Sequence, residues 1–193
     1  IRSAHFDLSS RSTRIFLRII NHSLAKYLRI CIFLRTFAAK MQNSTIMLTI
    51  GDQIPAFSVA DQDGNILTHE QLIGKKTVIY FYPKDSTPGC TAEACNLRDN
   101  YQRFSAAGYQ VYGVSKDSQK SHQNFIAKNQ LPFPLLSDPS TEMLQAFGAW
   151  GEKKMCGKTS IGTLRKTFVF DEKGILVQII DKVDTKNHTE QIL

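Results

Sequence analysis

Residues 77–99 read TVIYFYPKDSTPGCTAEACNLRD, and the order of residue types in this stretch decides the fold. Its first part, Thr77–Tyr82, is a run of β-branched and aromatic residues, which is typical of a strand buried on both faces. A loop rich in proline and glycine follows it. Thr87 suits the N-cap of a helix and Pro88 suits the first helical position. The pattern therefore predicts a strand, a shaped loop and a helix whose first turn contains Cys90.

The sequence on either side of this stretch alternates between strand and helix patterns that are separated by turn residues. The predicted elements are a hairpin of 56–60 with 66–68, a helix over 88–107, a strand over 109–115, a helix over 118–129, an extended segment over 132–136, a helix over 141–147 and a second hairpin of 164–170 with 175–180. This order predicts an α/β fold, with a mixed central β-sheet flanked by helices and an N-terminal β-hairpin. Because no repeat or low-complexity linker follows residue 47, residues 47–193 are predicted to form one domain.

The positive charge of the chain is confined to its first 46 residues. The 193 residues contain 24 Lys and Arg against 17 Asp and Glu, which gives a net charge of +7. Residues 1–46 hold eight of the basic residues and a single acid, Asp7, which accounts for the whole net charge. Residues 47–193 hold 16 residues of each sign and are neutral. A neutral domain argues against a basic nucleic-acid-binding domain, so no nucleic-acid partner is expected.

Residues 1–46 form a basic extension, rich in Arg and Ser, that is predicted to lie outside the fold. Basic residues such as Arg18 and Arg29 interrupt its apolar stretch, so neither a transmembrane helix nor a secretory signal is expected. The extension is either an organelle transit peptide or an upstream segment that is not native coding sequence. The second interpretation is favoured, because Met41 and Met47 lie just before the composition changes. A bacterial-type cytoplasmic location is expected, or an organelle such as a plastid or mitochondrion if the transit peptide is genuine.

The chain contains four cysteines, Cys31, Cys90, Cys95 and Cys156. They are too few for a disulfide-stapled secreted scaffold, and they include no Cys-x2-Cys pair of the kind that binds zinc. A domain of this length buries a sufficient core without staples. The cysteines therefore indicate a reducing compartment and chemistry rather than structural cross-links.

Cys90 is the candidate nucleophile of the chain. The thiolate is the reactive form of cysteine, and the unpaired N–H groups and dipole at a helix N-terminus stabilise negative charge on sulfur. The alternative is a small buried thiol that only packs. The Thr, Pro and Gly that precede Cys90 favour a shaped loop over simple packing. No histidine lies at a spacing that suggests a Cys–His dyad, so a cysteine hydrolase is not indicated.

The pattern Pro83-x3-Thr87-x2-Cys90 resembles the signature of the peroxiredoxins. The fuller run YPKDSTPGCTAEACNLRD is similar to the branch known as bacterioferritin comigratory protein or peroxiredoxin Q, as is the later segment Gly162–Phe168. The resemblance covers about residues 48–193 and implies a thioredoxin-like fold, which agrees with the order of elements predicted above.

The resemblance implies a role for each of five residues. Cys90 would be the peroxidatic cysteine and Cys95 the resolving cysteine. Thr87 would bind the peroxide and the thiolate through its hydroxyl, and Pro83 would shield the sulfur from water. Arg165 would hold the thiolate and the peroxide oxygens by charge-assisted hydrogen bonds. Without the resemblance, Arg165 would be interpreted as a surface ion-pair residue and Cys95 as a buried helix residue.

The activity implied is reduction of hydrogen peroxide and organic hydroperoxides, with Cys90 passing through a sulfenic acid and then forming a disulfide with Cys95. A thioredoxin-type protein would reduce that disulfide, with no metal, haem or flavin, and the enzyme is expected to be a monomer with no membrane partner. The alternatives are a non-enzymatic redox sensor or chaperone and a thioredoxin-like disulfide oxidoreductase. Cys156 matches no catalytic position and is interpreted as a bystander thiol.

Helix geometry places a condition on this mechanism. Residues five apart on an intact α-helix have Cα atoms about 8.5 Å apart and roughly 140° apart around the axis. A disulfide requires Cα atoms within about 7 Å. Cys90 and Cys95 therefore cannot be joined unless the first turns of their helix open.

Overall fold

The structure, a computed structural model, describes residues 47–155 and 158–193. Its strands are β1 (Ser58–Asp61), β2 (Ile66–Thr68), β3 (Lys76–Phe81), β4 (Tyr109–Ser115), β5 (Leu135–Ser137), β6 (Trp150–Met155), β7 (Lys158–Thr163), β8 (Lys166–Phe170) and β9 (Leu176–Ile180). Its helices are the short 3-10 helix η1 (His69–Leu72) and the α-helices α2 (Pro88–Asp99), α3 (Tyr101–Ala106), α4 (Gln119–Asn129), α5 (Glu142–Ala146) and α6 (His188–Ile192).

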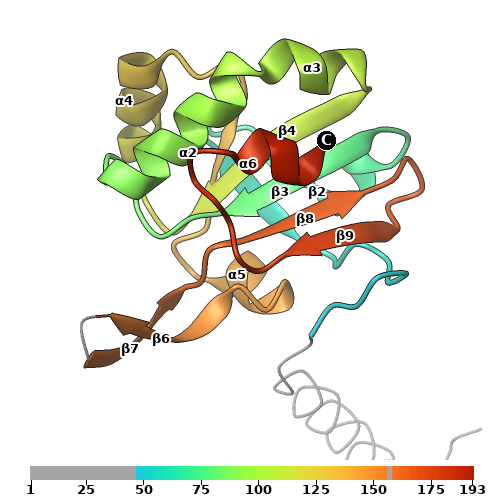
Figure 1. Ribbon diagram of the computed structural model, residues 1–193. Helices are drawn as coiled ribbons and strands as arrows, with labels where there is room; N and C mark the ends of the chain where they lie inside the picture. Colours follow the sequence, from blue (N-terminus) through green and yellow to red (C-terminus); the bar gives the residue numbers. More distant parts are fainter. Residues whose placement is uncertain (1–46, 156–157) are drawn as a thin grey trace, which may run out of the picture. The chain divides into compact units, whose positions relative to one another are not determined.

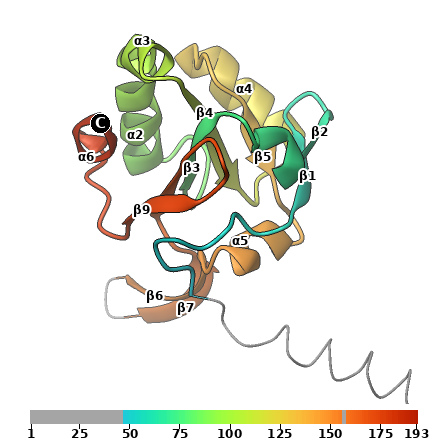
Figure 2. The ribbon, with the colours of Figure 1, turned by 90° about the vertical axis from the view of Figure 1, so that its right-hand side faces the viewer.

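Seven strands form one mixed sheet in the order β2-β1-β5-β4-β3-β8-β9. Strands β3, β4 and β5 are parallel neighbours, whereas β8 and β9 on one side and β1 and β2 on the other are antiparallel. Helices α2, α3, α4 and α6 cover one face of the sheet and α5 covers the other (Figures 1 and 2). The predicted mixed sheet, its flanking helices and its N-terminal hairpin are confirmed.

Strand β3 lies inside the sheet and is buried on both faces, as its composition predicts. Val78 and Tyr80 pack with residues of α2, α3 and α4 in one hydrophobic cluster. Ile79 and Phe81 pack with residues of α5 in a second cluster on the opposite face. The loop that follows β3 leads to α2, which packs in the first of these clusters.

The prediction of one helix over 88–107 is wrong in one respect, because the helix is interrupted at Asn100. The backbone of Asn100 has φ −107° and ψ 10°, outside the helical range, and the residue separates α2 from α3. Its side-chain Nδ2 donates to the carbonyl oxygen of Asn96 at 2.9 Å. Asparagine side chains compete in this way for backbone groups, which makes Asn a common point of interruption. The other predicted elements are confirmed, with ends that shift by up to three residues.

Besides η1, one hairpin and one helix were not predicted. Strands β6 and β7 form a separate two-stranded hairpin in register from Trp150↔Thr163 to Met155↔Lys158. Their sequences, WGEKKM and KTSIGT, lack the sustained alternation of apolar and polar residues that indicates a strand. Helix α6 has only five residues, too few to show a helical period. Both matter for the site, because the hairpin leads directly to Arg165 and α6 carries His188.

The short helix α6 lies beside α2 in both views (Figures 1 and 2). The side chain of Asn96 on α2 makes most of the polar contacts between them. Its Nδ2 donates to the carbonyl oxygen of Lys186 at 2.7 Å, and its Oδ1 accepts from the backbone N–H of Thr189 at 2.8 Å. Helix α6 is therefore fastened to the helix that contains Cys90 and Cys95.

Within the described residues, the hydrophobic clusters of the sheet run from Leu48 to Ile192. The predicted extension over 1–46, with Cys31, lies outside the described residues. Within the part of the chain that the structure describes, no helix has the length and apolar character needed to cross a bilayer.

A chain that begins at Met47 is therefore expected to fold as stably as the full chain. The described residues from Met47 onward supply a sheet, two hydrophobic clusters and the site described below. Thermal unfolding and peroxide turnover of the two chains check this prediction. A melting temperature that falls by more than about 4 °C, or a large loss of turnover, would show that residues 1–46 contribute to the folded domain.

Candidate active site

The loop after β3 brings Cys90 to the start of α2. Thr87 is the N-cap of this helix, with extended backbone angles, and Pro88 occupies the first helical position, as predicted. Cys90 is the third residue of the helix and is only 1% exposed. Its sulfur therefore lies at the positive end of the helix dipole and away from bulk water.

Arg165 lies 75 residues after Cys90 in the sequence, and its side chain contacts the Cys90 sulfur. It lies between β7 and β8, and its Nη2 donates to the Cys90 Sγ at 3.1 Å. Gly89 lies beside the guanidinium, since a Cβ there would stand 3.6 Å from the same Nη2, an ordinary van der Waals contact. Arg165 thus lies at hydrogen-bond distance from the Cys90 sulfur, and its role toward the thiolate and the peroxide stays a prediction.

The same guanidinium also pairs with Glu93, a residue that the sequence did not single out for the site. Arg165 Nη1 donates to Glu93 Oε2, and the Glu93 side chain is fully buried. Burial raises the pKa of Glu93 to about 7, and the charge of Arg165 offsets only part of that effect. Burial acts to lower the pKa of Arg165, but the charges of Glu93 and Cys90 outweigh it and the pKa is raised. The guanidinium is therefore a permanent cation at this site.

His188 on α6 lies behind Glu93. Its Nδ1 is 3.3 Å from Glu93 Oε1, and its Nε2 is 2.9 Å from the Thr167 hydroxyl. Burial, together with the charge of Arg165, lowers the pKa of His188 to about 4, so the ring is neutral at physiological pH. The scattered histidines gave no signal for this contact. Glu93 could have been noticed, because it lies three residues after Cys90 and so on the same helix face.

Thr87 and Pro83 belong to the loop that precedes the helix. The Thr87 hydroxyl donates to the carbonyl oxygen of Lys84 at 3.0 Å, so its only proton is already engaged. Its lone pairs can still accept a hydrogen bond from a peroxide O–H group. The role of Thr87 toward the peroxide and the thiolate stays a prediction. Pro83 begins the loop and is partly buried, and its shielding role stays a prediction.

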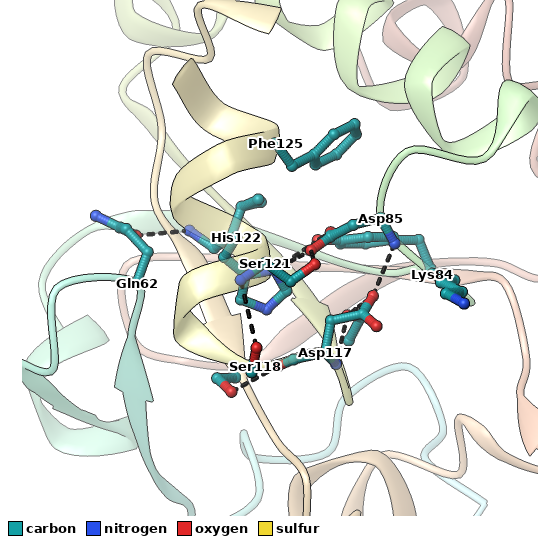
Figure 3. Close-up of polar contacts among 12 residues, drawn as sticks. Gln62, Lys84, Asp85, Asp117, Ser118, Ser121, His122 and Phe125 are labelled. Carbon is teal, nitrogen blue, oxygen red and sulfur yellow. Dashed lines mark hydrogen bonds and ion pairs between the residues drawn. The ribbon is translucent and has the colours of Figure 1, made fainter. Parts of the chain in front are cut away.

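A buried polar cluster holds this loop in place (Figure 3). The Asp85 carboxylate accepts from the Tyr82 hydroxyl at 2.7 Å and the Ser121 hydroxyl at 2.6 Å, and it contacts His122 Nδ1 at 2.9 Å. Its backbone N–H donates to Asp117 Oδ2 at 2.7 Å. Four separate contacts thus fix the residue in the middle of the loop, and sequence analysis missed all of them.

The cluster accounts for two further properties of the loop. Burial alone would raise the pKa of Asp85, but the hydrogen bonds from His122 and Ser121 outweigh it, so the pKa is lowered and the carboxylate is charged at neutral pH. The next residue, Ser86, has φ +57°, in the left-handed region that is costly for a residue other than glycine. The anchor at Asp85 holds that conformation, which turns the chain toward Thr87.

Cys95 lies on the same uninterrupted helix as Cys90, as the helix prediction required. Its side chain is partly buried, and its Sγ lies 4.0 Å from the Asn129 Oδ1 at the end of α4. Both cysteines are free thiols. The helix therefore holds them apart in this state. The backbone segment around Cys156 lies outside the described residues, so its bystander role stays a prediction.

The chain is similar to known proteins over most of its length. Residues 50–179 match the AhpC/TSA family. Peroxiredoxin Bcp of Escherichia coli is 41% identical over 146 residues, which cover 76% of this chain and 94% of that protein.

Two solved structures are similar to this chain in both fold and sequence. The Xanthomonas campestris bacterioferritin comigratory protein, from work on its alkyl peroxide reduction activity, has a TM-score of 0.66 at 40% identity, covering 70% of this chain and 87% of that chain. A cysteine-to-serine mutant of Xylella fastidiosa PrxQ has a TM-score of 0.71 at 31% identity, covering 77% of this chain and 94% of that chain. The chain therefore belongs to the AhpC/TSA family and, within it, to the Bcp/PrxQ peroxiredoxins.

Proposed function

We propose that this chain is a thiol peroxidase in which Cys90 reduces hydrogen peroxide and organic hydroperoxides. The observation that carries the proposal is the contact of 3.1 Å between the Arg165 guanidinium and a buried Cys90 sulfur at a helix N-terminus. A cation and a helix dipole together favour the thiolate, which is the form that attacks an O–O bond. The alkyl peroxide reduction studied in the X. campestris relative supports the inclusion of organic hydroperoxides.

The first step transfers oxygen to sulfur. The Cys90 thiolate attacks one peroxide oxygen, an S–O bond forms as the O–O bond breaks, and Cys90 becomes a sulfenic acid while hydroxide or an alkoxide leaves and takes up a proton to give water or an alcohol. Arg165 faces the sulfur and is placed to stabilise the charge that moves onto the leaving oxygen. Thr87, whose proton is engaged by the Lys84 carbonyl, accepts the peroxide O–H and so orients the substrate.

In the second step the Cys95 sulfur attacks the Cys90 sulfenic acid, the S–S bond forms as the S–O bond breaks, and the oxygen leaves as water. Both cysteines lie on α2, so several i to i−4 hydrogen bonds of its first turns must break before the sulfurs can meet. Exchanging such bonds for bonds to water costs on the order of 1 kcal/mol each, which formation of the disulfide offsets. Opening also presents the disulfide to a reductant, and we propose a thioredoxin-type protein for that step.

The proposal includes a setting for the enzyme. Its partners are the peroxide and the thioredoxin-type reductant, its oligomeric state is monomeric, and its thiols require a reducing compartment such as the bacterial cytoplasm. A non-enzymatic redox sensor would use the same cysteine and the same arginine. Sustained peroxide turnover in the presence of thioredoxin and its reductase separates the two functions, because a sensor reacts without turning over.

Replacement of single cysteines tests the assigned roles. Cys90→Ser is expected to abolish peroxide consumption, because it removes the nucleophile. Cys95→Ser is expected to abolish thioredoxin-dependent turnover while one sulfenic acid per chain still forms, and Cys156→Ser should leave turnover nearly unchanged. Coupled thioredoxin turnover and trapping with a sulfenic-acid reagent measure these outcomes. Turnover in Cys90→Ser near that of the unsubstituted chain would contradict the proposal.

Hydrogen exchange tests the opening of α2. Oxidation by one equivalent of peroxide is expected to remove protection from amides of residues 88–98, because the disulfide cannot form on an intact helix. Protection in β3 should be largely kept, since its hydrogen bonds to β4 and β8 are unaffected. The reduced chain and the oxidised Cys95→Ser chain are the controls. If α2 stays fully protected after oxidation, Cys90 must bond to another thiol and the role of Cys95 is wrong.

A further inference from the structure

The guanidinium of Arg165 donates hydrogen bonds to two buried acidic side chains on α2. Arg165 Nη2 donates to Cys90 Sγ at 3.1 Å, and its Nη1 donates to Glu93 Oε2. Cys90 is 1% exposed and Glu93 is fully buried. The two acids lie three residues apart on adjacent positions of one helix face, so a charge on either of them acts on the other.

The other groups that face Glu93 supply no second positive charge. His188 from α6 lies 3.3 Å from Glu93 Oε1, but its pKa of about 4 makes the ring neutral, and the contact lacks the geometry of a hydrogen bond. Tyr80 from β3 is uncharged, because burial and then the charge of Glu93 raise its pKa well above the ordinary value. Among the described residues that contact Glu93, Arg165 is therefore the single cation.

This arrangement sets the charge of the site. A thiolate at Cys90 and a cation at Arg165 already balance each other, so an ionised Glu93 would leave a buried, uncompensated negative charge. Glu93 avoids this cost when its carboxyl keeps its proton, in agreement with its pKa of about 7. Once Cys90 is oxidised to a neutral sulfenic acid, Arg165 loses its first anion and Glu93 can supply another.

We propose that Glu93 is a positioning residue that exchanges charge with Cys90 in each cycle, holding a proton while Cys90 is a thiolate and releasing it when Cys90 becomes a sulfenic acid. The proposal rests on the thiol peroxidase function given above. Glu93 acts through Arg165 and touches neither the peroxide nor the thioredoxin-type reductant.

The exchange balances the first step. The sulfur gives two electrons to the O–O bond, the S–O bond forms, and hydroxide or an alkoxide leaves and needs a proton. Thiolate, hydroperoxide and neutral Glu93 together give sulfenic acid, water or an alcohol, and ionised Glu93. The solvent then supplies no net proton, whereas a site without an ionisable group at position 93 must take one from the buffer.

The same exchange links oxidation to the opening of α2. Glu93 lies between Cys90 and Cys95, so opening the helix carries its side chain out of the buried site. The pKa of Glu93 in the closed helix, about 7, lies above the ordinary value of 4.5 that an exposed carboxyl has. Protonated Glu93 therefore favours the closed helix below about pH 4.5, and this preference is lost as pH rises through about 7. Loss of its proton on oxidation removes this preference for the closed helix, so the helix opens more readily once Cys90 has reacted.

Proton uptake during a single oxidation tests the proposal. Two chains that both carry Cys95→Ser, one with Glu93 and one with Glu93→Gln, are mixed with one equivalent of hydrogen peroxide in weak buffer slightly below pH 7, with a pH-indicator dye. The Glu93→Gln chain is expected to take up one proton for each Cys90 oxidised, and the Glu93 chain markedly less. Glu172→Gln, an exposed Glu on the surface, is the matched control and should behave like the Glu93 chain. A Cys90→Ser chain gives the blank.

Resolution is measured in chains that retain Cys95. Because glutamine cannot ionise, Glu93→Gln is expected to slow disulfide formation several-fold and to let the sulfenic acid accumulate, while Glu172→Gln resolves normally. In the chain without substitution at position 93, infrared difference spectra should show loss of a protonated-carboxyl band on oxidation. This measurement keeps the test available if Glu93→Gln does not fold.

Equal proton uptake with and without Glu93, or a carboxyl band that oxidation leaves unchanged, would overturn the proposal. Failure of the unsubstituted chain to form any sulfenic acid would instead contradict the thiol peroxidase function.

Discussion

The contact between the Arg165 guanidinium and the Cys90 sulfur is the interaction on which the rest of the site depends. It joins the start of α2 to the residue that precedes β8. The two segments lie close together because β8 pairs with β3 and α2 follows β3 in the chain. A buried thiol alone would resist ionisation, since burial penalises the charged form. One fixed cation at hydrogen-bond distance, added to a helix N-terminus, is what makes a buried sulfur suitable as a nucleophile.

Reduction of peroxide by Cys90 and formation of the disulfide with Cys95 require different conformations of α2. The first step requires a closed helix that holds Cys90 against Arg165, and the second requires the same helix to open so that Cys95 can approach. The structure fastens the helix from several sides, through Asn96 to α6 and through the loop anchored at Asp85. These fastenings are polar contacts that water can replace at modest cost, so the helix is held firmly and can still be released.

The sequence was sufficient to predict the elements whose pattern is local. The apolar run of β3, the Thr87–Pro88 start of α2 and the hairpin turns each carry their signal within a few residues, and all were confirmed. The break at Asn100 was missed because it depends on one side chain that bonds to a nearby carbonyl. The polar hairpin of β6 and β7 and the short α6 carry no strong period. His188 could not be predicted, because it lies on α6, which was itself missed. The contacts of Asp85 with Asp117, Ser121 and His122 could not be predicted either, because they join residues 32 to 37 positions apart.

The rate at which Cys90 reacts with hydrogen peroxide in an Arg165→Met chain tests the central claim most directly. Methionine keeps much of the length and apolar stem of arginine but removes the charge and the donors, so packing is largely retained. Stopped-flow measurement, with hydrogen exchange of β3 to confirm that the fold is intact, is expected to show a second-order rate constant lower by about a hundredfold to a thousandfold. An Arg165→Met chain that is folded and reacts with peroxide at the rate of the unsubstituted chain would contradict the account.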